Sequence, residues 1–310
     1  MSNQLPTRVR AAWARWSLAL AWCVLPLSAG AALSDATARW SSSSQMSSEV
    51  LAWSGWALGL IGLAIARPWS LTIMRILAPG ALVLGLIVLV ARGGTADALA
   101  ACNLAVTAAL AWSSGFARAA VDAVSYGTEE RFPLQIPPAL LFGPVQIAVA
   151  VVVGPPVATV MLLADRQWLL GALVVVIGLP AAAFAARSVH GLSNRIVVFV
   201  PAGITLVDTF SLSAPVHIPR REIRAIEPLA GPVDDAAADL RIGATRRSVR
   251  MALADPTDAL PVRVGRTNSE NVVTTALLFA PSARTQFLAR VAARRVVHTA
   301  SAPPTSSSPA

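Results

Sequence analysis

The chain has 310 residues, of which 55% are apolar and 13% are charged, against roughly 25% charged residues in typical soluble proteins. Such a composition indicates a membrane protein. All 25 basic residues are arginine, which excludes Walker A nucleotide-binding loops and pyridoxal-phosphate enzymes, because both need a lysine.

Six apolar runs occupy the first 186 residues. Crossing a hydrocarbon core roughly 30 Å thick takes about 20 apolar helical residues. The sequence therefore predicts an α-helical bundle of about six transmembrane helices within residues 11–187, after a cytoplasmic N-terminus over residues 1–10. The predicted spans are approximately residues 16–34, 50–66, 69–91, 98–117, 139–164 and 167–186.

The arginines predict the orientation, because positively charged loops stay in the cytoplasm. A cytoplasmic N-terminus puts nine arginines on or near that side and three, Arg39, Arg92 and Arg166, outside. Arg75 lies one to two turns inside the third span, where its stem is expected to reach back to the headgroups. We therefore expect a protein of the cell membrane with its N-terminus and C-terminal domain in the cytoplasm.

The first apolar run is also compatible with a signal peptide cleaved after residue 32 or so. Cleavage would leave five helices that start outside, and the C-terminal domain would still be cytoplasmic. Both interpretations remain open.

Prolines interrupt the fifth span at Gly143-Pro144 and again at Gly154-Pro155-Pro156. A broken helix can line a substrate path in a transporter, and prolines also kink packed helices that transport nothing. The six predicted spans contain no Asp, Glu or His, which argues against a proton-coupled transporter.

The loop between the fourth and fifth spans carries two adjacent acids, Glu129 and Glu130. They form either a solvated turn or a contact for the basic C-terminal domain.

From about Asn194 the long apolar runs give way to short β-rich stretches, followed by a helix from Ser282 to about Arg295. These features predict a small cytoplasmic mostly-β domain over residues 194–297, a barrel or a sandwich. The tail over residues 298–310 is rich in Pro, Ser and Thr and is expected to be disordered. The predicted strands are residues 195–200, 204–208, 217–219, 223–228, 240–242, 247–254, 261–265 and 272–279.

The stretch from Arg195 to Asp208, followed by residues 215–223, resembles the opening of bacterial pleckstrin-homology-like (PH-like) domains. Residues 277–288 resemble the last strand and helix of that family. The whole chain is similar to actinobacterial multi-pass membrane proteins that carry such a domain. The resemblance covers about a third of the chain, implies a PH-like barrel with a C-terminal helix, and supplies no catalytic residues.

Residues 187–310 contain 15 arginines and 9 acids, a net charge of +6. Anionic inner-leaflet lipids attract such residues by about 1 kcal/mol each, although the same residues could be solvated charges only. Nucleic acid is not expected as a partner, because aromatic residues for base stacking are not interleaved with the arginines. The candidate contacts for anionic lipid or a membrane protein partner are Arg220, Arg221, Arg224, Arg246, Arg247 and Arg250.

No catalytic, cofactor-binding or metal-ligand motif accompanies the three histidines. The sequence therefore predicts a non-enzymatic protein without a cofactor, namely a scaffold, assembly or regulatory protein whose domain binds a partner or the inner leaflet. The alternative is a transporter or channel component.

Overall fold

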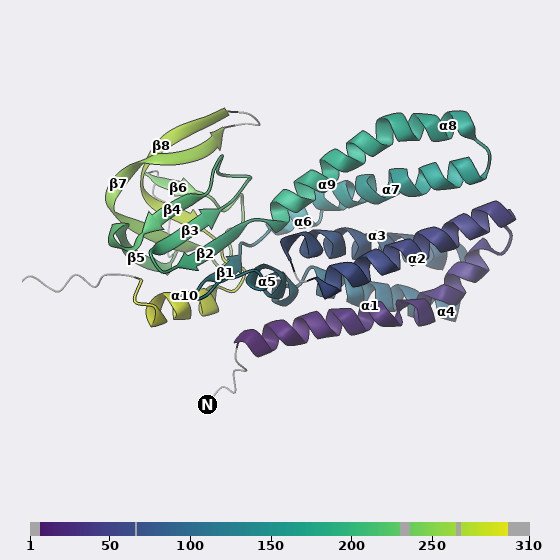
Figure 1. The fold of residues 1–310 in the computed structure, drawn as a ribbon, viewed down its shortest axis with the longest axis horizontal. Helices are drawn as coiled ribbons and strands as arrows, with labels where there is room; N and C mark the ends of the chain where they lie inside the picture. Colours follow the sequence, from purple (N-terminus) through teal and green to yellow (C-terminus); the bar gives the residue numbers. More distant parts are fainter. Residues whose placement is uncertain (1–6, 66, 230–235, 265–267, 297–310) are drawn as a thin grey trace, which may run out of the picture.

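The computed structural model describes residues 7–65, 67–229, 236–264 and 268–296. Helices gather at one end of its long axis and strands at the other (Figure 1). We call helices α1 to α9 the helical half, and the strands together with helix α10 the β region. The predicted disordered tail over residues 298–310 and the first six residues of the predicted N-terminus lie outside the described residues. The helices are α1 (Thr7–Thr37), α2 (Ser42–Ala64), α3 (Pro68–Arg92), α4 (Thr95–Ala111), α5 (Ser114–Asp122), α6 (Pro138–Leu141), α7 (Pro144–Ala164), α8 (Trp168–Leu173), α9 (Leu179–Ser193) and α10 (Arg284–Ala293).

Four segments of the helical half are long and apolar enough to cross a membrane, and α4 with α5 makes a fifth if this bent pair is one span. These candidate spans support a membrane protein. The described residues thus contain four or five of them, where the sequence predicts about six. Helix α2 is not among the candidate spans, because its first turns are rich in serine and contain Glu49. The four segments are Ala12–Thr37, Pro68–Arg92, Pro138–Ala164 and Trp168–Ser193.

Two tryptophans fix α1 against α2. Trp22 Nε1 donates a hydrogen bond to the Trp56 carbonyl at 2.9 Å, and Trp56 Nε1 donates to the Trp22 carbonyl at 3.0 Å. The Trp22 indole lies against Gly59, where an added Cβ would clash with it, whereas a Cβ on Gly55 would meet nothing within 4 Å. Gly59 therefore serves close packing between helices of this chain.

The predicted fourth span, residues 98–117, is not one straight helix. Helix α4 ends at Ala111, and α5 is bent by 52° relative to it. The cause is Ser113, whose side chain accepts a hydrogen bond from the Phe116 N–H at 3.2 Å and so caps the start of α5. Helix α5 consequently packs against α1 and the first strand of the β region.

The last two candidate spans, Pro138–Ala164 and Trp168–Ser193, also deviate from regular α-helix. The fifth predicted span breaks at Gly143, between α6 and α7, while Pro155 and Pro156 lie inside α7 without ending it. Between α8 and α9 the chain makes a π-helical turn over Val174–Gly178. Pro180 follows this turn, and a proline cannot donate the backbone hydrogen bond that a regular α-helix needs, which accounts for the widened turn.

The described part of the β region contains two four-stranded sheets. The first has the order β1-β2-β3-β4, and all its neighbours are antiparallel. The second has the order β5-β7-β8-β6, in which only β6 is parallel to its neighbour. The strands are β1 (Glu130–Pro133), β2 (Ile196–Val200), β3 (Gly203–Val207), β4 (Val216–Pro219), β5 (Ile223–Pro228), β6 (Ala237–Asp239), β7 (Val249–Val264) and β8 (Asn268–Phe279).

Strand β1 comes from the loop between the fourth and fifth predicted spans. It pairs antiparallel with β2, with Glu130 opposite Phe199 and Pro133 opposite Ile196. The predicted domain of residues 194–297 leaves this strand out. The β region is therefore built from two stretches of the chain, and helices α6 to α9 lie between them in the sequence.

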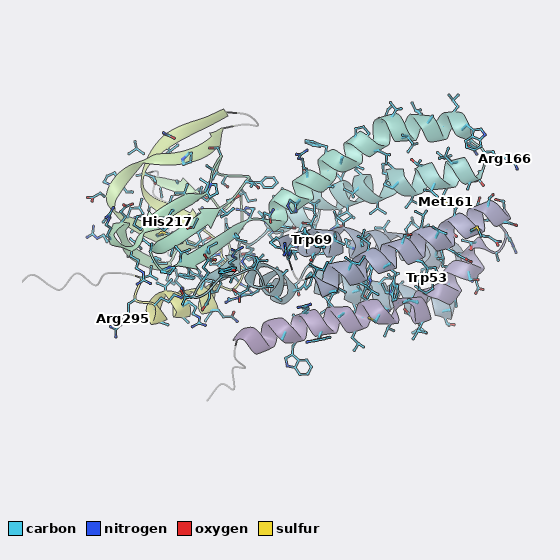
Figure 2. All side chains as sticks on the ribbon, in the orientation of Figure 1. Trp53, Trp69, Met161, Arg166, His217 and Arg295 are labelled. Atoms are coloured by element: carbon cyan, nitrogen blue, oxygen red, sulfur yellow. The ribbon has the colours of Figure 1, made fainter. Side chains whose placement is uncertain are left out.

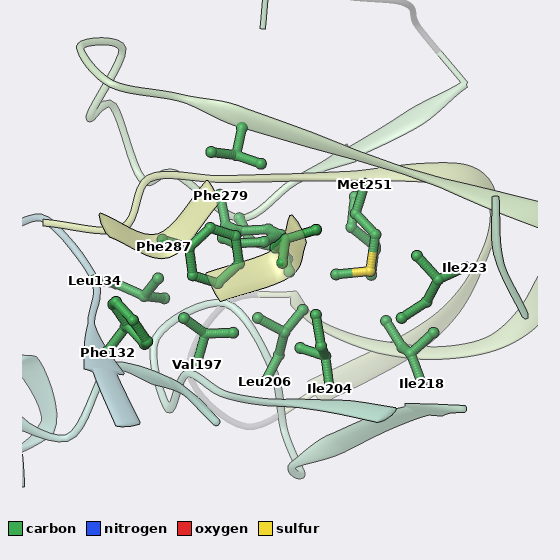
Figure 3. Close-up of a cluster of buried hydrophobic side chains, with 14 of the residues drawn as sticks. Phe132, Leu134, Val197, Ile204, Leu206, Ile218, Ile223, Met251, Phe279 and Phe287 are labelled. Carbon is green, nitrogen blue, oxygen red and sulfur yellow. The ribbon is translucent and has the colours of Figure 1, made fainter. Parts of the chain in front are cut away.

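The core of the β region lies between the two sheets and is closed by α10 (Figure 3). Phe287 of α10 lies among Phe132, Phe199 and Phe279, with ring centroids 5.0 to 5.6 Å from its own. All four side chains are fully buried. Each such phenyl ring stabilises the fold by roughly 1.5–3 kcal/mol through removal from water. Phe132, on β1, thus belongs to this core as much as the C-terminal residues do.

Two details of the second sheet differ from the predicted strands. Residues 240–242 are not a strand, because Ile242 and Gly243 have positive φ angles of 48° and 94°. Strand β6 lies just before them, and residues 249–254 and 261–264 of two predicted strands belong to the single long strand β7, while residue 265 lies outside the described residues.

Candidate functional site at the junction of the two halves

Several buried charged side chains lie where the β region meets the helical half. We call this region the junction. It contains a carboxylate shared by three arginines, a buried ion pair, a strained apolar contact and a buried arginine of α3.

Glu130, at the start of β1, is the shared carboxylate. Its oxygens lie 2.9 Å from Nε of Arg290 on α10, 3.3 Å from Nη2 of Arg294 just after α10, and 3.8 Å from Nη2 of Arg118 on α5. The Arg118 guanidinium also lies over the Phe132 ring, 3.6 Å from its centroid. This Glu130 cluster therefore joins α5, β1 and α10, and Asp122 is a second carboxylate that interacts with Arg118.

Glu129 has a smaller role than its neighbour. It pairs with Arg131 at 3.4 Å, and both side chains are about a quarter exposed. A pair of this kind stabilises a protein by roughly 0–1 kcal/mol. The acidic pair of the sequence is thus split, with Glu130 inside the junction and Glu129 at its edge.

Arg195 and Asp208 form an ion pair in which both side chains are 1% exposed. Arg195 Nε and Nη2 donate to the two carboxylate oxygens at 2.9 and 2.7 Å, in the bidentate geometry that makes such pairs strong. The remaining arginine N–H groups donate to the Gln135 carbonyl at 3.1 Å and the Leu240 carbonyl at 2.8 Å. One guanidinium therefore ties the end of α9 to the segment after β1 and to the second sheet.

The same ion pair fixes the loop after β3. Asp208 Oδ1 accepts the backbone N–H groups of Phe210 and Ser211 at 3.0 and 3.3 Å. Each half of the pair is consequently surrounded by further hydrogen-bond partners, which a buried charge requires.

Ile242 makes one of the apolar contacts between the two halves, in addition to those that Ile196 and Val198 of β2 make with the helices. It packs against a cluster that includes Trp112, Leu140, Val145 and other residues of the helical half. A positive φ is rare for a β-branched residue, and such strain persists only where the surrounding packing imposes it. Trp112 is at the α4–α5 break, whereas Leu140 and Val145 flank the α6–α7 break. Ile242 of the β region and residues at both helix breaks therefore pack in one apolar cluster.

Arg75 lies inside the helical half, close to the junction. The residue is only 6% exposed, and the expectation that its stem reaches the headgroups stays a prediction. Nη1 donates to Ser193 Oγ at 3.2 Å, and the guanidinium carbon lies 4.8 Å from the centroid of the Trp112 ring. These contacts lie at the C-terminal ends of α9 and α4, whose partial negative charges stabilise a cation.

A second buried polar network lies beside Arg75 and is satisfied. Asn194 Nδ2 can only donate, so His190 Nε2 accepts from it at 2.8 Å and the ring proton resides on Nδ1. Nδ1 then donates to Thr72 Oγ1 at 2.9 Å. His190 therefore joins α3 to α9.

The six arginines predicted as lipid or partner contacts lie outside the junction and do not form one patch. Arg220 and Arg221 are on the 3₁₀ turn between β4 and β5, and Arg224 is on β5. The other three, Arg246, Arg247 and Arg250, precede or begin β7. Strands β5 and β7 run antiparallel, with Ile223 opposite Leu253 and Pro228 opposite Val249, so the two groups lie at opposite ends of this pair of strands.

The first group lies far from the helical half. Strand β5 is at the end of the molecule opposite the helices (Figure 1). His217, which is on β4 shortly before Arg220, lies at the same end (Figure 2). The Arg221 side chain is 84% exposed and only 3.8 Å from the adjacent Glu222 carboxylate. In the second group Arg247 donates to the Ser282 carbonyl at 3.0 Å, and Arg250 lies 3.7 Å from Glu227. The arginines of the first group are therefore less engaged in contacts within the β region than those of the second group.

One carboxylate of the β region titrates away from its ordinary range. Burial alone would raise the pKa of Asp239, but hydrogen bonds from the side chain and backbone of Arg241, together with its charge, outweigh burial and lower that pKa. The same contacts raise the pKa of Arg241. The two side chains are 2.7 Å apart and anchor the turn that holds Ile242.

Among the described residues, no group of three or more His, Cys, Asp or Glu could hold a metal ion. No protein-family model, curated protein or solved structure matches this chain. Its function must therefore be inferred from the geometry of the junction and the surface of the β region.

Sequence reasoning missed the Arg195–Asp208 pair, although a signal for it exists. The turn Val200-Pro201-Ala202-Gly203 sets the hairpin register, which puts Ile196 opposite Val207. One step further along the hairpin, Arg195 and Asp208 face each other. For Ile242 and Arg118 the sequence contains no comparable local signal, since their partners are distant in the chain.

Proposed function

We propose that this chain is a non-enzymatic scaffold of the cell membrane, whose β region binds a partner protein in the cytoplasm at a fixed position relative to the helices. The observation that carries the proposal is strand β1. In the sequence this strand lies between α5 and α6 of the helical half, and in the structure it is part of the β region. The β region is therefore connected to the helical half at both ends of β1 as well as at the start of β2.

The distribution of charge supports a cytoplasmic β region. Trp69, at the end of the helical half that faces the β region, and Arg166, at the opposite end, mark its two ends (Figure 2). The end beside Trp69 contains Arg15, Arg67 and Arg118, which the positive-inside rule assigns to the cytoplasm. At the opposite end, Arg92 is paired with Asp35 at 3.3 Å and with Asp97 at 3.4 Å, so its charge is offset.

The architecture of the β region supports a PH-like domain in which β1 is supplied by the membrane part. Two packed sheets are followed by a C-terminal helix whose Phe287 closes the core. We also propose that all six predicted spans cross the membrane, and that α2 forms the least apolar of them.

A partner protein fits the exposed arginines better than the protein's own bilayer does. Arg221 and Arg224 lie at the end of the β region that points away from the helices, so the junction holds them off the membrane surface. An acidic protein surface in the cytoplasm can reach them there. Anionic lipid headgroups of the same membrane cannot, unless the Glu130 cluster and the Arg195–Asp208 pair open.

Charge reversal tests this proposal on the full chain in lipid nanodiscs. The double variant Arg221→Glu/Arg224→Glu should lose a cytoplasmic partner that photo-cross-links to the wild type. Arg246→Glu, an exposed arginine at the other end of the β5–β7 pair, is the matched control and should keep the partner. Equal cross-linking of all three proteins, or binding of the wild type to anionic vesicles that the double variant loses, would contradict the proposal.

A transporter or channel component is the second candidate. The observation in its favour is that the α4–α5 and α6–α7 breaks meet in one apolar cluster with Ile242. Solute flux through proteoliposomes that changes on Ile242→Gly would support this candidate over a scaffold.

A further inference from the structure

The side chains of Arg75 and Trp112, which contact each other, contain two hydrogen-bond donors that no side chain or carbonyl of the described residues satisfies. Arg75 Nε and Trp112 Nε1 are both buried, and neither reaches an acceptor. A buried donor left without a partner costs about 1–3 kcal/mol, and more if it is charged. Two such donors in groups that touch each other need a common explanation.

The charge of Arg75 is also incompletely compensated. Among the described residues it hydrogen-bonds a neutral hydroxyl, Ser193 Oγ, which itself donates to the Val189 carbonyl at 3.1 Å. No carboxylate of the described residues lies within ion-pair distance of Arg75. The neighbouring His190 side chain bonds Thr72 and Asn194. The ends of α4 and α9 supply only partial negative charge.

We propose that Arg75 and Trp112 form a binding site for a small inorganic anion, of which chloride is the simplest. The anion would accept from Arg75 Nε–H and Trp112 Nε1–H together and would neutralise the guanidinium. A monatomic anion suits the site because it has no fixed acceptor direction and needs contact with only these two adjacent groups. A neutral water molecule would satisfy the donors and leave the charge of Arg75 uncompensated.

The site lies where an anion would stabilise the junction. Trp112 is the residue at the α4–α5 break and packs in the same apolar cluster as Ile242 of the β region. Fixing its indole would hold the break, and with it the contact between the two halves. The expected effect is an anion-dependent stability of the full chain.

The test compares thermal unfolding of the detergent-solubilised full chain in sodium chloride and in sodium gluconate at equal ionic strength, since gluconate is a much larger anion than chloride. Chloride should raise Tm of the wild type by roughly 2–4 °C. Trp112→Phe keeps the ring and removes the N–H, so its shift should fall by at least half. Arg75→Met should abolish the shift. Ser193→Ala, which leaves both donors in place, is the matched control and should retain it.

Equal Tm of the wild type in the two salts would overturn the proposal and assign the site to water. So would a chloride shift that Arg75→Met and Trp112→Phe leave unchanged. A crystal of the wild type grown in sodium bromide provides a measurement that needs no variant. Anomalous density from bromide is expected beside Arg75 Nε and Trp112 Nε1, and its absence there at full bromide concentration would also refute the site.

Discussion

Replacing Asp208 by asparagine removes the negative charge that faces Arg195 and keeps the size of the side chain. Taking away one partner of a buried ion pair costs about 3–5 kcal/mol, because the other charge stays buried. We expect the lower end, about 3 kcal/mol, for two reasons. Arg195 keeps its bonds to the Gln135 and Leu240 carbonyls, and the amide oxygen of the new residue still accepts the backbone N–H groups of the loop after β3.

Hydrogen–deuterium exchange of the full chain in nanodiscs measures this cost locally. Every 1.4 kcal/mol is a factor of ten in an opening equilibrium, so amides of β2 and β3 should exchange on the order of 100-fold faster in Asp208→Asn. Peptides from α1 and α2, which lie outside the junction, are the internal reference.

Glu222→Gln is the matched control, because it removes the exposed partner of Arg221 in an ion pair 3.8 Å long. Such a pair contributes about 0–1 kcal/mol, so exchange should change by no more than about fivefold. If Asp208→Asn also stayed within that limit, the Arg195–Asp208 pair would not hold the β region to the end of α9, and the reasoning would fail.

Three further substitutions test other parts of the structure. Gly59→Val should clash with Trp22 and cost roughly 1–3 kcal/mol in thermal unfolding, whereas Gly55→Val should change little; equal effects would refute the α1–α2 packing. Glu130→Gln removes the carboxylate that Arg118, Arg290 and Arg294 share, so protease cleavage in α10 should become faster, and an unchanged rate would contradict the Glu130 cluster. Because the pKa of Asp239 is lowered in the folded state, its stabilising effect is present above its unfolded pKa of about 3.9 and lost as the pH falls through the folded pKa. The Tm difference between wild type and Asp239→Asn should therefore shrink below about pH 4, and a difference independent of pH would count against it.

Hydropathy predicted a helical, apolar N-terminal half, in which the described residues contain four or five candidate spans where about six were predicted. It did not predict the α4–α5 break, because the uncharged run over residues 98–117 continues through Trp112, Ser113 and Ser114. That break depends on one hydroxyl, Ser113 Oγ, which caps α5. Whether a serine caps a helix or points into one is decided by the packing around it, and this information is not local.

The hairpin of β2 and β3 was predictable for the opposite reason, since its turn and both strands are adjacent in the chain. Strand β1 was not, because Glu130 and Phe199 pair across a separation of 69 residues. A short stretch such as Glu130–Pro133 has no periodicity from which to recognise a strand. Its hydrogen-bond partners lie entirely in the other part of the protein.

The segment between the two helix breaks, residues 112–143, belongs to both halves at once. At its centre Leu134 N–H donates to the Arg195 carbonyl at 2.9 Å, Gln135 N–H to the Ala280 carbonyl at 2.7 Å, and the Ser282 N–H donates to the Pro133 carbonyl at 2.9 Å. At its ends the segment is flanked by the two breaks, whose residues share an apolar cluster with Ile242. A force on the β region, such as that from a bound partner, therefore acts on α4–α5 and α6–α7 through backbone hydrogen bonds. A domain joined only at residue 194 would rotate about that single connection, whereas this one can move only if the helix breaks move with it.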